Sequence, residues 1–157
     1  MDTLPGLAEL STVLDRVGSF IRLGTPTHDL GAPATTVLAV LVNEGEMRIS
    51  RLVDRERISQ PGMTALVGRL VEAGYVQRWA DPTDGRATLV AATRSGREYI
   101  SDLHARRARF LADAVRQLPT EHQRALLAAT DALAALADQP TTDGRRVPAT
   151  ARRRDVS

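Results

Sequence analysis

The fold is decided by the stretch "LVDRERISQPGMTALVGRLVEAGYVQR" (residues 52–78), followed almost at once by "DPTDGRATLVAATRSG" (residues 81–96). After Ser59, apolar residues recur at helical spacing, namely Met63, Leu66, Val67 and Leu70. This pattern predicts a helix with one buried face. We expect Ser59 to cap its beginning, Pro61 to occupy its first turn, and Ala73-Gly74 to end it.

A shorter helix is expected directly before this one. Ser50 is its expected N-cap, and the helix reaches about Glu56. The residues Met47-Arg48-Ile49 are too few for anything more than a strand fragment. A short helix, a tight turn and a second helix with a polar outer face are typical of a helix-turn-helix.

The residues after the second helix predict a β-hairpin. Tyr75 to Trp79 is a short β-prone run, and Ala87 to Ala92 has no turn residues and is suited to pair with it. Between the two runs, Asp81-Pro82 and Asp84-Gly85 are strong turn dipeptides. Arg86, at the end of this charged loop, is expected to project from the protein rather than into its core. A hairpin placed directly after a helix-turn-helix is the wing of a winged helix.

Two helices are expected on the N-terminal side of this unit. Residues 7–21 carry an apolar stripe with coiled-coil spacing, formed by Leu7, Leu10, Leu14, Val17 and Ile21. Residues 24–31, which include Pro26, interrupt the pattern. A second helix is expected from Ala34 to Glu44, ended by Gly45, and its buried residues are expected to be Val37, Leu38 and Leu41.

Two more helices are expected on the C-terminal side. Thr93 caps a long helix to about Leu118, whose inward-facing residues are expected to be Ile100, Leu103, Phe110, Leu111, Ala114 and Leu118. Pro119 breaks the chain, and Thr120 begins a last helix in which alanines are interspersed with Leu126, Leu127, Leu133 and Leu136. From Gln139 the composition changes to Pro, Thr, Gly and Arg, which predicts a disordered tail.

The composition excludes several classes of protein. The 157 residues suffice for one domain, or for one domain plus an extension. A 43% hydrophobic content predicts a folded core, and because aromatic residues make up only 3%, aliphatic side chains must fill it. The chain has no cysteine, hence no disulfide or thiol switch, and neither a metal nor a cofactor is expected. Without a long apolar run or a signal sequence, we expect a cytoplasmic protein with no membrane contact. The net charge of +2 does not by itself indicate a nucleic-acid binder.

Together, the motifs at this spacing resemble the MarR (multiple antibiotic resistance regulator) family of bacterial transcription factors. The resemblance is detailed over about residues 46–97 and architectural over the remaining helices to about residue 138. Its most specific part is the wing pattern Asp-x-Arg, then apolar residues, then Thr-x-x-Gly, following a helix-turn-helix. It implies a mostly α (α+β) fold, a winged helix-turn-helix whose N- and C-terminal helices form a dimerisation layer.

This resemblance also implies a division of the chain. The expected parts are an N-terminal dimerisation helix and linker (residues 1–32), a winged helix-turn-helix DNA-binding domain (33–97, with the recognition helix at about 59–74 and the wing at about 75–92), C-terminal dimerisation helices (93–138) and a disordered Arg-rich tail (139–157).

A helix in the major groove must expose small or hydrogen-bonding residues near its N-terminus. The expected DNA-binding residues of this helix are Ser59, Gln60, Pro61, Gly62, Thr64, Ala65 and Arg69. Gln60 can pair with an adenine edge, Thr64 can contact a base or a phosphate, and Arg69 is expected to reach a phosphate. The alternative for Gln60 and Thr64 is an ordinary solvated helix face.

In the wing, the resemblance implies that Arg86 enters the minor groove, where narrow A·T tracts concentrate negative potential. Asp84 matches the wing aspartate of the family and is expected to hold the Arg86 guanidinium in place. Asp81 is expected to pair with Arg78. The alternative for these charges is an ordinary surface ion pair.

The chain departs from the family pattern at three positions. Gly85 stands where many relatives carry a second wing arginine, and Ala92 replaces a common leucine. Arg57 replaces the frequent turn glycine of the helix-turn-helix, which costs roughly 1 kcal/mol if the position needs a positive φ.

The function implied is that of a homodimeric, DNA-binding repressor of palindromic operators. The unused apolar stripe of residues 7–21 and the Leu/Ala-rich last helix would pack against a second copy. A small anionic or phenolic effector is expected to release the DNA, with Arg22, His28 and His104 as candidate effector-binding residues. The alternative for each of the three is an ordinary surface or interface residue. The alternative is a winged-helix protein-interaction module with weak or no DNA binding. No arrangement of catalytic residues is evident, so an enzyme is not expected.

Overall fold

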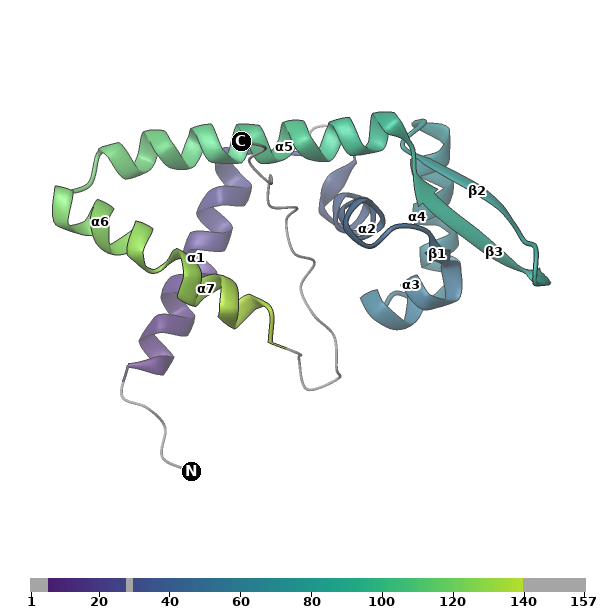
Figure 1. The fold of residues 1–157 in the computed structure, drawn as a ribbon, viewed down its shortest axis with the longest axis horizontal. Helices are drawn as coiled ribbons and strands as arrows, with labels where there is room; N and C mark the ends of the chain where they lie inside the picture. The colour runs from purple at the N-terminus through teal and green to yellow at the C-terminus, as the bar shows by residue number, and fades with distance from the viewer. Residues whose placement is uncertain (1–5, 28–29, 140–157) are drawn as a thin grey trace, which may run out of the picture.

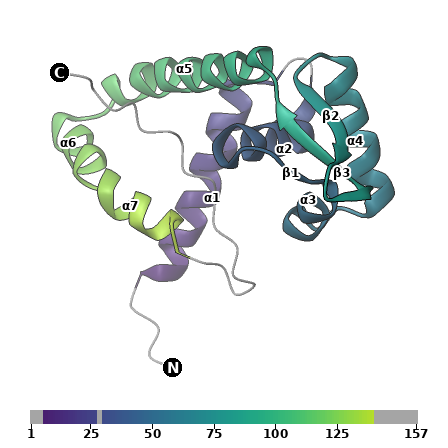
Figure 2. The same ribbon diagram turned by 45° about the vertical axis from the view of Figure 1, so that its right-hand side comes forward.

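The computed structural model describes residues 6–27 and 30–139. In these residues the elements are, in chain order, α1 (Leu7–Gly24), α2 (Gly31–Glu44), β1 (Met47–Arg48), α3 (Ile49–Glu56), α4 (Gln60–Glu72), β2 (Val76–Asp81), β3 (Asp84–Ala92), α5 (Arg94–Arg116), α6 (Thr120–Ala128) and α7 (Thr130–Ala137). The long helix α5 runs along one side of the molecule, with the winged helix at its N-terminal end and α6 turning back from its C-terminal end (Figures 1 and 2). This mostly helical architecture with one small sheet is the predicted fold class.

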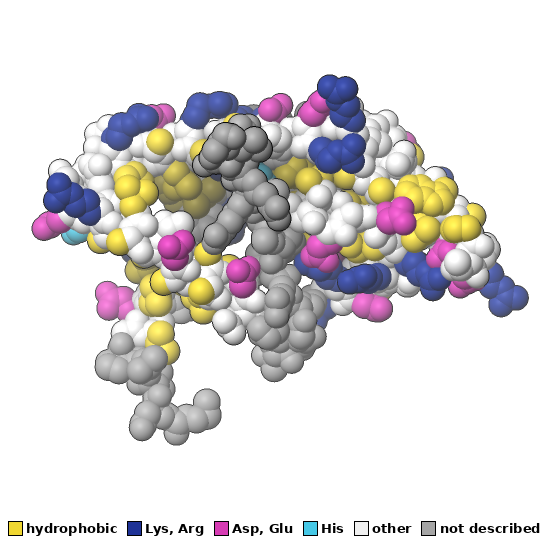
Figure 3. Space-filling view, viewed as in Figure 1, with side chains coloured by type: hydrophobic (Ala, Val, Ile, Leu, Met, Phe, Trp, Pro, Cys, Tyr) yellow, Lys and Arg dark blue, Asp and Glu magenta, His cyan; other side chains and the backbone are white. Residues whose placement is uncertain are grey.

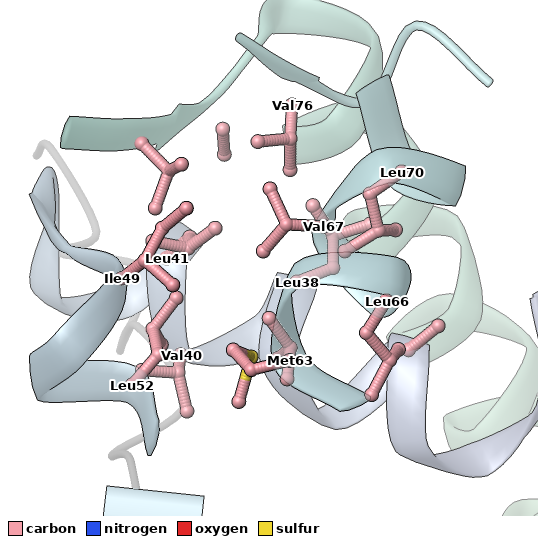
Figure 4. Close-up of a cluster of buried hydrophobic side chains, with 14 of the residues drawn as sticks. Leu38, Val40, Leu41, Ile49, Leu52, Met63, Leu66, Val67, Leu70 and Val76 are labelled. Carbon is pink, nitrogen blue, oxygen red and sulfur yellow. The ribbon is translucent and has the colours of Figure 1, made fainter. Parts of the chain in front are cut away.

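The core lies between α2, α3, α4 and the sheet (Figure 4). The expected apolar faces supply it, since the fully buried side chains include Leu38, Leu41, Leu52, Met63, Val67 and Leu70. Val76 and Val90 close the core from the sheet. Helix α4 therefore sits on a packed support, with its polar face turned outward.

The sheet is antiparallel and has the strand order β1-β3-β2. The first strand is held through two residue pairs, Met47 with Val90 and Arg48 with Leu89. Strand β2 pairs with β3 from Val76–Ala92 outward to Asp81–Asp84. The connecting loop is therefore shorter than the charged turn that we predicted, and the hairpin beyond Leu89 consists of two strands alone.

Two of the three predicted helix caps are confirmed. The Ser59 hydroxyl accepts a hydrogen bond from Gly62 N at the start of α4, and Thr93 accepts one from Gly96 N at the start of α5. The predicted cap at Ser50 is wrong. The N-cap of helix α3 is Arg48, two residues earlier, because the extended backbone of Arg48 leads directly from β1 into the helix.

Arg57 has a φ of 52°, the one positive φ of a non-glycine residue in the described chain. The turn of the helix-turn-helix therefore does require the left-handed conformation that glycine adopts without strain.

Helix α2 begins at Gly31 rather than Ala34, because Pro33 lies in the first turn, where its missing N–H breaks no helical hydrogen bond.

The C-terminal helices differ most from expectation. The predicted last helix is divided at Ala129 into α6 and α7, and Thr130 Oγ1 lies 3.5 Å from Leu126 O, a contact of the kind that bends helices. Leu118 was expected to face inward but is 39% exposed. Ile100 and Leu103 are buried as predicted, whereas Phe110, Leu111 and Ala114 are half-buried. The predicted tail lies outside the described residues, apart from Gln139.

Within residues 6–27 and 30–139, no helix is both long enough and apolar enough to cross a lipid bilayer.

Candidate nucleic-acid interface

The N-terminal half of α4 presents a polar, exposed surface. Ser59, Gln60, Pro61, Thr64, Ala65 and Arg69 are all exposed, and Gly62 is half-buried. The Thr64 hydroxyl donates to Gln60 O at 2.9 Å and keeps its lone pairs for an outside donor. A Cβ on Gly62 would lie 3.0 Å from the Ile58 side chain, so glycine permits the tight packing of this turn. The predicted recognition residues are thus accessible at the start of the helix, except Arg69, which is exposed in its last turn.

The wing carries the predicted Asp84 and Arg86 near its tip, within strand β3 rather than in the loop before it. Asp84 already pairs with Asp81 across the hairpin, so Arg86 is the third residue of β3. Asp84 Oδ1 accepts a hydrogen bond from Arg86 N at 3.1 Å. Our expectation that Asp84 holds the guanidinium was wrong, because its carboxylate holds the backbone instead. The Arg86 side chain is exposed.

A groove separates the start of α4 from the wing. Its walls include Gln60 and Thr64 on one side and Asp84 and Arg86 on the other. Four of the predicted residues therefore meet at one groove, whereas Ser59, Pro61, Gly62, Ala65 and Arg69 lie outside it. Arginine side chains, with acids among them, follow this edge of the winged helix from α3 to the wing tip (Figure 3).

Residues that we did not predict as DNA contacts line the same groove, among them Arg48, Arg78, Trp79 and Thr88. Arg78 was not detectable from strand alternation, because a residue two positions from the core residue Val76 is expected on the same face of the strand as Val76. Arg48 was not detectable, because a two-residue strand has no sequence pattern that reveals its partner.

Asp81 contacts Arg48, and the predicted pair with Arg78 is wrong. Arg48 Nε and Nη2 each lie 2.7 Å from Asp81 Oδ2. The hydroxyl and the backbone N–H of Thr83 donate to Asp81 Oδ1 at 2.7 and 2.8 Å. These bonds from Thr83, and then those from Arg48, lower the pKa of Asp81 to about 2, although its burial acts in the opposite direction.

A second cavity, of about 540 Å³, lies between the end of α1, α2 and α5. It falls within the size range of small-molecule sites. Two of the predicted effector residues, Arg22 and His104, line it together with Arg107. The third, His28, lies outside the described residues.

The chemistry of this cavity favours an anion. Arg107 Nε is buried and, within the described residues, has no hydrogen-bond acceptor. Burial lowers the pKa of His104, and the neighbouring Arg107 guanidinium lowers it further. No acidic side chain is among the described residues that line the cavity. A carboxylate bound here could therefore accept a hydrogen bond from Arg107 Nε, with no acidic side chain of the described lining to repel it.

Comparisons with known proteins agree with this geometry. Residues 28–87 match the family model described as MarR family. An HTH-type transcriptional regulator of Mycobacterium bovis, Mb0904, is 31% identical over 84% of this chain and 92% of its own length.

Solved structures share the fold. The transcriptional regulator Tm0710 from Thermotoga maritima superposes with a TM-score of 0.69 at 26% identity, over 82% of this chain and 94% of that one. The PcaV transcriptional regulator from Streptomyces coelicolor, in complex with its natural ligand, has a TM-score of 0.54 at 21% identity, over 87% of this chain and 99% of that one. The helix-turn-helix, the wing and these likenesses together show that the chain belongs to the MarR family of DNA-binding transcriptional regulators.

Proposed function

We propose that this regulator is a cytoplasmic homodimeric repressor that binds a palindromic operator. In this proposal the start of α4 enters the major groove and the wing enters the adjacent minor groove. The observation that carries it is the groove in which Gln60 and Thr64 face Arg86. A side chain that can read a base edge and a cation at the wing tip are thereby placed on one face of the molecule.

The homodimer is supported by apolar surface that the single chain leaves uncovered. In the part of the chain that the structure describes, twelve large apolar residues are exposed, all on α1, on α6 and α7, or just after α5: Leu7, Leu10, Val13, Leu14, Val17, Phe20, Leu23, Leu118, Leu126, Leu127, Leu133 and Leu136. Apolar side chains gather over this part of the molecule (Figure 3). A clustered apolar surface of this kind marks an interface between proteins. Two copies joined here would present two winged helices to two half-sites.

Release by a small organic anion is the second part of the proposal. It rests on the cavity that holds Arg22, His104 and Arg107, and on the bound ligand of PcaV, a protein of the same fold. The cavity adjoins α1 and α5 as well as the winged helix. A ligand that favours one arrangement of these elements shifts the population toward it, and so changes the spacing of the two DNA-binding heads.

The test is the anisotropy of labelled DNA from the region beside this protein's own gene, compared with scrambled DNA over a salt series. We expect the wild type to prefer the native fragment, and Arg86→Ala to weaken that binding by about 1–3 kcal/mol. Arg116→Ala is the matched control. It also removes one exposed arginine, but at the far end of α5, where Arg116 is paired with Asp113.

Equal, weak binding of the wild type to both fragments would contradict operator recognition and favour the protein-interaction module. If Arg86→Ala and Arg116→Ala bound alike, the wing would have no part in the contact. If both variants prefer the native fragment as strongly as the wild type does, recognition would rest on α4 alone.

A further inference from the structure

One buried acid lies at the surface that we propose for DNA binding. Asp81 is 6% exposed, and both of its carboxylate oxygens are used. Oδ2 accepts from Arg48, and Oδ1 accepts twice from Thr83. Arg48 Nη2 also lies 3.3 Å from Thr83 Oγ1, which closes the group. We name Arg48, Asp81 and Thr83 the wing clamp.

The wing clamp joins two parts of the winged helix that are distant in sequence. Arg48 is the last residue of β1 and stands directly before α3, the first helix of the helix-turn-helix. Asp81 is the last residue of β2, and Thr83 lies in the turn at the wing tip. A side chain anchored beside the helix-turn-helix therefore reaches across β3 to the end of the wing.

The outer wing has few other restraints. Strand β1 pairs with β3 only through Met47 and Arg48, opposite Val90 and Leu89. Beyond Leu89, toward the tip, the hairpin has two strands, and none of the residues that the structure describes adds a third strand beside it. An isolated two-stranded hairpin is marginally stable in water and twists readily. The direction of the tip, and so the position of Arg86, depends on the bonds that hold the tip back to β1.

We propose that Asp81 is a positioning residue for DNA binding, which acts through Arg48 and Thr83 to hold the wing tip, and with it Arg86, at a set distance from α4. This inference rests on the proposed function, because it presupposes that α4 and the wing contact the same DNA. Asp81 itself need not touch the DNA, since its carboxylate is enclosed by donors of the protein.

Charge and positioning predict opposite results when Asp81 is replaced. Removing an acid from a DNA-binding face strengthens attraction to phosphate, so electrostatics alone predicts tighter binding of Asp81→Asn at low salt. Loss of the clamp predicts weaker binding to the operator, with binding to scrambled DNA unchanged or tighter. We expect the preference for the operator to fall about 5- to 10-fold.

Glu46→Gln is the matched control, because Glu46 is an exposed acid one residue before β1 and the substitution makes the same change in charge. Thr83→Val is a second variant, which removes the hydroxyl of the clamp without changing charge. We expect it to weaken operator binding in the same direction as Asp81→Asn but by less. Thermal unfolding by circular dichroism shows that each variant is folded at the temperature of the binding assay.

A double-mutant cycle separates positioning from a general loss of stability. If Asp81 acts by placing Arg86, Asp81→Asn has little effect on operator binding once Arg86 is already alanine. If the losses of operator affinity from Asp81→Asn and Arg86→Ala simply add, the positioning role of Asp81 is contradicted and the proposed function stands. The same conclusion follows if Asp81→Asn binds the operator more tightly, as Glu46→Gln does. If wild type shows no preference for the operator, both proposals fall together. If Arg86→Ala alone has no effect, the wing has no part in the contact and the clamp falls, while operator recognition by α4 stands.

Discussion

At the scale of single residues, His104 and Arg107 make the second cavity sensitive to pH. In the free protein the lowered pKa of His104 keeps the imidazole neutral near neutral pH. A bound anion favours the charged form, and so raises the pKa of His104 in the complex. Binding then takes up a proton, and affinity rises as the pH falls through the pKa of the complex.

This gives a prediction for benzoate as a probe of the cavity. We expect its affinity, measured by titration calorimetry, to increase about 3- to 10-fold from about pH 8 to about pH 6. His104→Ala should abolish the dependence, and Arg107→Gln should weaken binding at every pH. His122→Ala is the control, because His122 is exposed on α6, outside the cavity. A pH profile that His104→Ala leaves unchanged would assign the proton to another group.

At the scale of elements, the approach of α5 to the hairpin depends on Gly96. A Cβ on Gly96 would lie 2.2 Å from Tyr75 O, in the backbone just before β2. We expect Gly96→Ala to lower the free energy of unfolding by about 1–3 kcal/mol, since one of the two elements must move. Gly68→Ala is the matched control. Gly68 is in the interior of α4 with no atom within 4 Å of an added Cβ, so alanine there should stabilise by about 0.5–1 kcal/mol.

Urea unfolding followed by circular dichroism measures both substitutions. Opposite signs for the same chemical change would establish that the contact, and not helix propensity, accounts for Gly96. Stabilisation by both alanines would show that α5 can shift without loss of packing.

The elements also show where sequence reasoning succeeds. Ser59, Thr93 and Gly74 carry local signals, because caps and turns depend on the residue's own backbone and hydroxyl group. Gln60, Thr64 and Arg86 could be predicted as candidate contacts because they are polar residues close to such a local signal, the first two at the start of a helix and the third after a turn. The partner of Asp81 could not, because Arg48 is 33 residues away and reaches it only through the pairing of β1 with β3. The division at Ala129 was also missed, since alanine favours an unbroken helix.

At the scale of the whole molecule, the exposed apolar helices determine whether two DNA-binding heads act together. Leu127 on α6 is 72% exposed in the single chain. If α6 packs against a second copy, Leu127→Glu places a charge in that interface. We expect a monomer in sedimentation velocity, and operator affinity about 100-fold or more lower, because the two half-sites are no longer bound by one particle.

Ala105→Glu is the control for an added acid, since Ala105 is exposed on α5 away from α6 and α7. A Leu127→Glu protein that remains dimeric would move the interface elsewhere, with α1 as the next surface to test. A monomer that binds the operator as tightly as wild type would contradict recognition by paired heads.

Trp79 is the one tryptophan of the chain, and it lines the groove between α4 and the wing. Indole emission responds to the polarity and the stacking partners of its immediate surroundings. Because no other indole contributes to the signal, the emission of the unlabelled protein reports on this groove alone. The native chain thus carries an optical probe in the groove that Arg86 also lines, at the place where we propose that DNA binds.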